Sequence, residues 1–194
     1  MDEETRLKYW KQFVTDPILW KFKAHALAHA AEVLHECEIK ATDTLIREQP
    51  ASGSLEASRL IADMSMFPIA YMLAGLAIEN AIKGVLIDQL GTDDRSDPRV
   101  KAITSEHDLT KLAQDTLPEL IEPNRGLLEK LYEYVTWLGR YPRPRKPNNY
   151  MKEDSESGVV EMFGVSQNDW SGYVNLLSVL LSKLGERTKD ESAV

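Results

Sequence analysis

The stretch AYMLAGLAIENAIKGVLIDQL, from Ala70 to Leu90, decides the fold. It is apolar on almost every side, which is typical of a helix in the interior of a bundle. Its middle nevertheless carries Glu79, Asn80 and Lys83. Because burying an unpaired charge is costly, these side chains need partners inside the fold. We therefore expect residues 67–90 to form a central helix around a polar cluster, with Gly91 ending it.

Caps and apolar spacing predict the other helices. Asp16-Pro17 closes a short N-terminal helix within residues 1–16 and starts a second one, because Asp is a good N-cap and Pro fits the first helical turn. Further helices are predicted at residues 17–47, from Ser105, from Pro123 to Gly139 and from about Ser166 to Gly185. Polar connections are expected at residues 49–58, 91–100 and about 147–165, and a disordered tail at residues 188–194.

The resulting fold class is all-α. No stretch shows the sustained apolar–polar alternation of a half-buried strand. About four long helices plus short ones make an up-and-down helical bundle, and the 194 residues suit one domain with its core in residues 17–187.

Composition restricts the classes of function. The formal net charge of -8 gives no overall attraction to nucleic acid or to an anionic membrane, so any such contact must be local. Cys37 is the only cysteine, which excludes a multi-cysteine zinc site. The acidic N-terminus is unlike a secretory signal, and the longest charge-free apolar run is shorter than the roughly 20 residues of a membrane span. We expect a soluble, cytoplasmic protein without membrane contact.

Glu79 and Lys83 stand one helical turn apart, with Glu nearer the N-terminus, which is the favourable order for an ion pair. The favoured interpretation is a half-buried pair that fixes helix packing. The alternative is a ligand-binding patch that opens onto a cleft, in which Asn80 adds a donor and an acceptor.

His107 is predicted in the first turn of its helix, where the helix dipole disfavours the imidazolium form. A neutral imidazole can accept a proton, as a general base does. The same position equally suits a histidine that only forms a hydrogen bond with a neighbour.

A basic segment follows the helix that ends at Gly139. Cations and one aromatic residue are concentrated there, namely Arg140, Tyr141, Arg143, Arg145 and Lys146. Three prolines stiffen the segment, so it is the best candidate for contacts with phosphate, and Tyr141 offers a surface for base stacking. The alternative is a rigid, solvated connection.

The metal-ligating residue types do not form a complete set. His25 and His29 share a helix face, and Glu32 with His35 forms one Glu-x-x-His motif, but a di-iron bundle needs two such motifs. We expect surface histidines and neither a metal nor a cofactor. Cys37 is expected as a small core residue.

Three fragments resemble the HEPN domain family. AIENAIKG at residues 77–84 resembles the family pattern with Glu and, four residues on, Lys. His107-Asp108-Leu109 resembles its His-Asp-Leu signature, and Arg140-Tyr141-Pro142 resembles its Arg-Tyr-Pro. The three occur in the family's order.

The resemblance implies a helical bundle that commonly dimerises and functions in defence, toxin–antitoxin or nucleotide-handling systems. Many members are ribonucleases with an Arg followed a few residues later by a His, and here Arg99 lies just outside that spacing from His107. The leading expectation is therefore a dimeric module that binds nucleotide or RNA, in some systems beside a nucleotidyltransferase partner. The alternatives are an RNA endonuclease using His107 and Arg140, and a purely structural interaction bundle.

Overall fold

The computed structural model describes residues 2, 3, 5, 6, 14–92, 94–114, 117–139, 151–153, 160–162 and 167–184. Its helices are α2 (Pro17–Glu48), α3 (Leu55–Met64), α4 (Phe67–Leu90), α5 (Pro98–Ser105), α6 (Leu109–Gln114), α7 (Pro118–Glu133), the π-helical turn η1 (Tyr134–Leu138) and α8 (Gln167–Lys183). The predicted all-α fold class is confirmed.

One short hairpin interrupts the helical pattern. β1 (Met151–Glu153) pairs antiparallel with β2 (Val160–Met162), with Met151 opposite Met162. Both strands fall in the segment that the sequence predicts as an exposed loop, so that prediction is wrong for these six residues. Three-residue strands are too short to show the alternation by which strands are recognised in a sequence.

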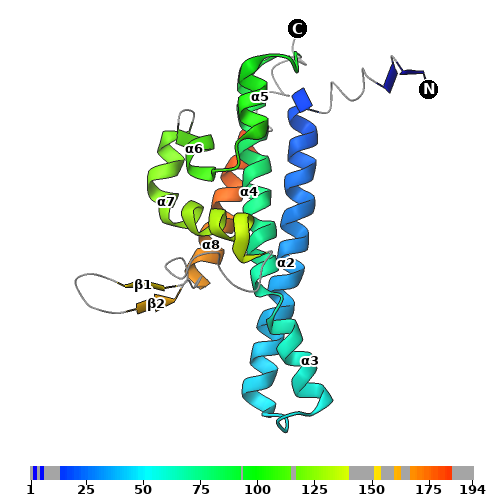
Figure 1. Ribbon diagram of the computed structural model, residues 1–194, viewed down its shortest axis with the longest axis vertical. Coiled ribbons are helices and arrows are strands. Elements are labelled where there is room, and N and C mark those ends of the chain that lie inside the picture. Colours follow the sequence, from blue (N-terminus) through cyan, green and yellow to red (C-terminus); the bar gives the residue numbers. More distant parts are fainter. Residues whose placement is uncertain are drawn as a thin grey trace.

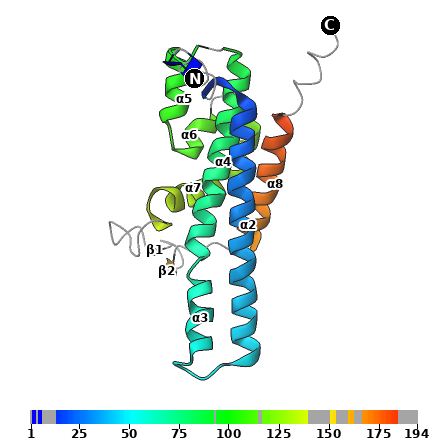
Figure 2. The same cartoon turned by 90° about the vertical axis from the view of Figure 1, so that its right-hand side faces the viewer.

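α4 is the central helix, as predicted. α2 runs beside it in the opposite direction, α8 lies along another side, and α5, α6, α7 and η1 also pack against it (Figures 1 and 2). Most α4 residues from Ala70 to Ile87 are buried. Gly91 ends the helix with a left-handed φ of 54°, the conformation for which glycine has no steric penalty.

α2 packs closely on α4 because its facing positions are small. Ala24, Ala31 and Ala41 are buried. The Asp16 carboxylate accepts the Ile18 N–H at 2.9 Å and caps the helix, with Pro17 in its first turn. The helix ends one residue beyond the predicted Arg47.

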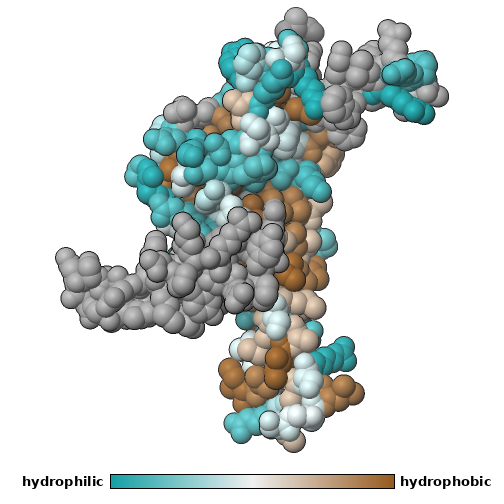
Figure 3. All heavy atoms as spheres, in the orientation of Figure 1, coloured by the Kyte–Doolittle hydropathy of each residue, from teal (hydrophilic) through white to brown (hydrophobic). Residues whose placement is uncertain are grey.

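The far end of the molecule is a helical hairpin made by the second half of α2 and by α3 (Figures 1 and 2). Residues 49–58 were predicted as a connection, but α3 already begins at Leu55, where Ser54 Oγ accepts the Ala57 N–H at 3.0 Å. Large apolar side chains are exposed on this hairpin, and Figure 3 shows them as brown patches at its end. They include Ile46, Leu55 and Ile61.

Two helix starts differ from the sequence prediction. α5 occupies part of the predicted polar loop at residues 91–100, and Ser105 is its last residue rather than the cap of the next helix. α7 starts at Pro118, so Pro123 lies inside it, in the first two turns. The predicted N-terminal helix lies mostly outside the described residues, and the predicted tail lies wholly outside them.

Within the described residues, the stretch Leu55–Leu90 is long and apolar enough to cross a membrane, with a mean hydropathy of 1.6 over its most apolar window. The core helix of a soluble protein meets the same criterion, so length and hydropathy alone do not identify a membrane span. α4, which supplies most of the stretch, is the helix that the rest of the bundle covers.

An aromatic cluster joins α2, α4, η1 and α8. His35 stacks on Trp170 with ring centroids 3.8 Å apart, and Tyr71 contacts Phe67, Tyr134 and Trp170. His35 is only 7% exposed, so the expectation of a surface histidine is wrong for it, although His25 and His29 are exposed. Burial lowers the pKa of His35. Cys37, expected in the core, is exposed on α2.

Candidate functional site

The site is built on one turn of α4. Glu79 and Lys83 point from the same side of the helix because residues four apart share a face. Both are buried, with 5% and 2% of their surface exposed. Lys83 Nζ donates to Glu79 Oε1 at 2.9 Å, so the predicted ion pair exists, and it is buried more deeply than the half-buried pair that the sequence predicts.

The same pair holds the end of α5. Lys83 Nζ also donates to the Thr104 carbonyl oxygen at 3.1 Å, in the last turn of that helix. A helix leaves its last carbonyl groups without partners inside the helix, and a cation satisfies them well. Lys83 therefore fixes the position at which α5 ends and the chain turns towards α6.

His107 lies in that turn, between α5 and α6. Glu106 Oε1 accepts the N–H groups of His107 and Asp108, each at 2.9 Å. Asp108 Oδ1 accepts the N–H groups of Thr110 and Lys111 and is the cap of α6. His107 was predicted in the first turn of a helix that starts after Ser105; the structure places it before the cap instead.

The capping bonds change the acidity of both carboxyl groups. The hydrogen bonds from the Asp108 and His107 N–H groups lower the pKa of Glu106. Partial burial favours the neutral form of Asp108, but its hydrogen bonds from Thr110 and Lys111 outweigh this effect, and its pKa is lowered too. Both groups are carboxylates at neutral pH, and they hold the backbone on each side of His107.

Glu79 contacts the imidazole ring of His107 through one carboxylate oxygen. Its Oε1, which already accepts from Lys83, lies 3.0 Å from His107 Nδ1. A carboxylate oxygen that pairs with a lysine can only accept, so Nδ1 carries the proton in this contact. The neutral ring then has Nε2 as its free acceptor. The side chain of His107 is 63% exposed.

Glu79 Oε2 has a different environment from Oε1. It is buried and has no hydrogen-bond partner among the residues that the structure describes. The ring of Trp20 lies 6.0 Å from Lys83 Nζ, at the outer limit of a cation–π contact. Among the described residues, the ion pair of Glu79 with Lys83 is thus made through Oε1 alone.

The structure brings together Glu79, Lys83 and His107, which the sequence singled out from two separate segments. Asn80 points elsewhere: its Nδ2 donates to the Leu76 carbonyl oxygen of its own helix at 2.6 Å. Arg140, Tyr141, Arg143 and Arg145 lie outside the described residues. Among the described residues, no cluster of three or more His, Cys, Asp or Glu side chains could hold a metal ion.

Sequence reasoning missed the Thr104 carbonyl and the role of Glu106 because it missed α5. The signal was present: Ser96-Asp97-Pro98 repeats the Asp-Pro arrangement that marked the start of α2. Asp97 Oδ1 accepts the Arg99 N–H at 2.8 Å and caps α5.

Comparison of the chain with models of protein families, with curated proteins and with solved structures found no match.

Removing one partner of the buried pair should destabilise the protein strongly. Lys83→Met leaves the Glu79 carboxylate buried without its cation, and we expect the free energy of unfolding to fall by about 3–5 kcal/mol. The double variant Glu79→Gln with Lys83→Met should recover most of this loss. Urea denaturation followed by circular dichroism measures all three proteins.

Lys40→Met is the matched control. Lys40 and Glu36 are also four residues apart in a helix, at 3.2 Å, but both are exposed, so the loss should stay within about 0.5 kcal/mol. Equal losses of unfolding free energy for Lys83→Met and Lys40→Met would contradict the proposed contribution of the buried pair to stability.

Proposed function

We propose that this protein is a HEPN-like module that binds the phosphate groups of a nucleotide or RNA in a defence or toxin–antitoxin system. The observation that carries the proposal is the buried Glu79 carboxylate held against Nδ1 of the exposed His107. A surface histidine needs no such support, whereas a histidine that must present one nitrogen to a ligand does. The motif resemblance around residues 77–84 and 107–109 supports the same assignment.

The contacts divide the site into a binding part and a supporting part. Glu79 and Lys83 are almost fully buried, so in this proposal they act on the ligand through the orientation of His107. Lys111 lies on the next helix, with its side chain exposed, and offers a cation close to His107 in the chain. In this proposal His107 and Lys111 provide a local contact for phosphate on a protein whose net charge is -8.

The basic segment supplies the remaining contacts in the proposal. Arg140, Arg143 and Arg145 are assigned to phosphate oxygens and Tyr141 to base stacking, on the sequence alone. The segment directly follows the π-helical turn η1 and Gly139. Turns of this type occur often at functional sites.

A specific observation also favours the RNA endonuclease as a second candidate. A carboxylate on Nδ1 leaves Nε2 outward, which is how many enzymes present a general base. In that reaction His107 Nε2 takes the proton of a ribose 2′-OH, and the 2′-oxygen attacks phosphorus. The bond from phosphorus to the 5′-oxygen then breaks, the 5′-oxygen takes a proton from water, and a 2′,3′-cyclic phosphate remains, while Arg140 stabilises the charge of the phosphorane.

We further propose a cytoplasmic homodimer, in some systems with a nucleotidyltransferase partner. The family resemblance suggests the dimer, and the exposed apolar residues Ile46, Leu55 and Ile61 of the α2–α3 hairpin support it. The apolar helix α4 is covered by the chain's own helices. Sedimentation at the 22.0 kDa mass of one chain at micromolar concentration would contradict the dimer.

Titration with nucleotides and short RNA at two salt concentrations tests the proposed function. Arg140→Ala with Arg143→Ala should weaken binding and reduce the slope of log affinity against log salt by about 2 units, because two fewer phosphate contacts release counterions. His107→Ala should abolish cleavage where the wild type cleaves, and it should spare much of the affinity, because it removes one contact while the arginines of the basic segment keep theirs. Fluorescence anisotropy and gel analysis of the RNA measure the two effects.

Lys23→Ala with Lys40→Ala is the control of equal charge. Both lysines are exposed on α2, so this variant should bind as the wild type does. Absence of binding by the wild type, or equal weakening in both double variants, would contradict the proposal and leave the bundle as an interaction module.

A further inference from the structure

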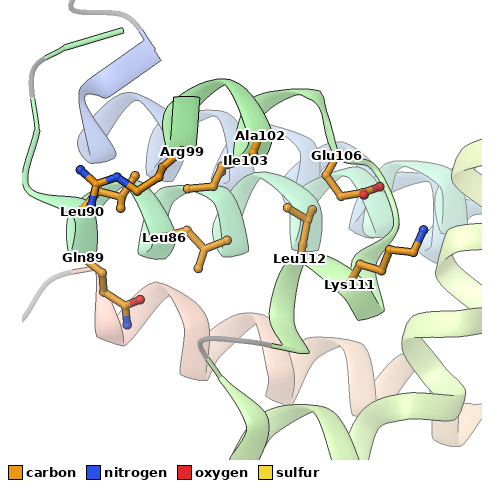
Figure 4. Close-up of a pocket in the computed structure, with 9 residues that line it drawn as sticks. All are labelled: Leu86, Gln89, Leu90, Arg99, Ala102, Ile103, Glu106, Lys111 and Leu112. Atoms are coloured by element: carbon orange, nitrogen blue, oxygen red, sulfur yellow. The ribbon is translucent and has the colours of Figure 1, made fainter. Parts of the chain in front are cut away.

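A pocket of about 590 Å³ lies between α4, α5 and α6 (Figure 4). This volume is within the range of small-molecule sites. The pocket is lined by Leu86, Gln89 and Leu90 of α4, Arg99, Ala102 and Ile103 of α5, Glu106, and Lys111 and Leu112 of α6.

The lining residues give the pocket a direction. Arg99 and Gln89 lie at one end, and Glu106 and Lys111 at the other. Between them Figure 4 shows the aliphatic side chains of Leu86, Ile103 and Leu112. The pocket therefore has an apolar middle between two polar ends, which suits an extended ligand with an aliphatic body.

Arg99 is held in place and still has donors to offer. Its Nε and Nη2 contact the Asp97 carboxylate, at 3.1 Å and 2.6 Å for the closest pairs. The remaining nitrogen, Nη1, carries two N–H groups. The side chain is 65% exposed, so a ligand in the pocket can reach it. A guanidinium fixed in this way loses little side-chain entropy when it binds an anion.

The opposite end disfavours an anion. Hydrogen bonds from two backbone N–H groups lower the pKa of Glu106, so it is a carboxylate at neutral pH, and its charge offsets that of Lys111 nearby. Asp108 is a second carboxylate next to Lys111, at 3.6 Å, whereas Arg99 pairs with the Asp97 carboxylate and keeps the N–H groups of Nη1. An anionic head group therefore binds better beside Arg99 and Gln89. The aliphatic body then extends over Ile103 towards Leu112.

We propose that this pocket binds an aliphatic carboxylate of medium chain length, with its carboxylate on Arg99 and Gln89. A nucleotide is a poor fit, because none of the described residues that line the pocket has an aromatic side chain to stack a base. Glu106 and Lys111, at one end of the pocket, also lie next to His107, but the assigned carboxylate position is at the opposite end, beside Arg99 and Gln89. The inference therefore does not depend on phosphate binding at His107.

Isothermal titration of the full chain with decanoate, below its micellar concentration, tests the inference. We expect binding of one decanoate per chain, weakened about tenfold or more by Arg99→Gln because a charge-assisted hydrogen bond is lost. Ala102→Trp fills the pocket from an exposed position on α5 and should abolish binding without lowering the melting temperature. Decanol and decylamine should bind at least about tenfold more weakly than decanoate.

Lys101→Gln is the matched control, because it removes the same charge from the same helix and Lys101 does not line the pocket. It should leave decanoate affinity within about twofold of the wild type. Absence of decanoate binding, equal affinity for decylamine, or binding that Ala102→Trp leaves intact would overturn the proposal. So would binding of adenosine monophosphate that decanoate displaces, since this would make the pocket a nucleotide site.

Discussion

The Glu79 carboxylate is the contact on which the arrangement of α4, α5 and α6 depends. It is buried in the central helix, and a buried charge must be paired. Lys83 supplies the pairing charge and, through its bond to the Thr104 carbonyl, fixes the end of α5. His107 then lies where its Nδ1 meets the same oxygen. Two separate parts of the chain, α4 and the end of α5 with the turn that follows it, thus meet at one buried ion pair.

This constraint also gives a reason for the presence of the Glu79–Lys83 pair in so apolar a helix. Hydrophobic residues of similar size would pack α4 with equal or greater stability. What they would not supply is a fixed orientation for the imidazole on the surface. In this account, the buried pair contributes the geometry of His107, and the surrounding bundle of α2, α7 and α8 contributes the stability.

Sequence reasoning predicted the elements that have strong local signals. The all-apolar pattern of residues 67–90 and the Asp16-Pro17 start of α2 gave those two helices almost to the residue. α3 was missed because Gly53 and the serines beside it suggested a connection, and α5 because its few apolar residues lie in a charged stretch. The convergence of Glu79 with His107 could be anticipated as a requirement, but the atoms that meet depend on tertiary packing.

The tautomer of His107 tests the central claim most directly. Long-range ¹H–¹⁵N correlation spectra, recorded where the imidazole is neutral, show which ring nitrogen carries the proton. The account predicts a proton on Nδ1 in the wild type, because Nδ1 donates to the Glu79 carboxylate, and loss of this preference in Glu79→Ala. A proton mainly on Nε2 in the wild type, as in a free histidine, or the same spectrum in both proteins, would contradict it.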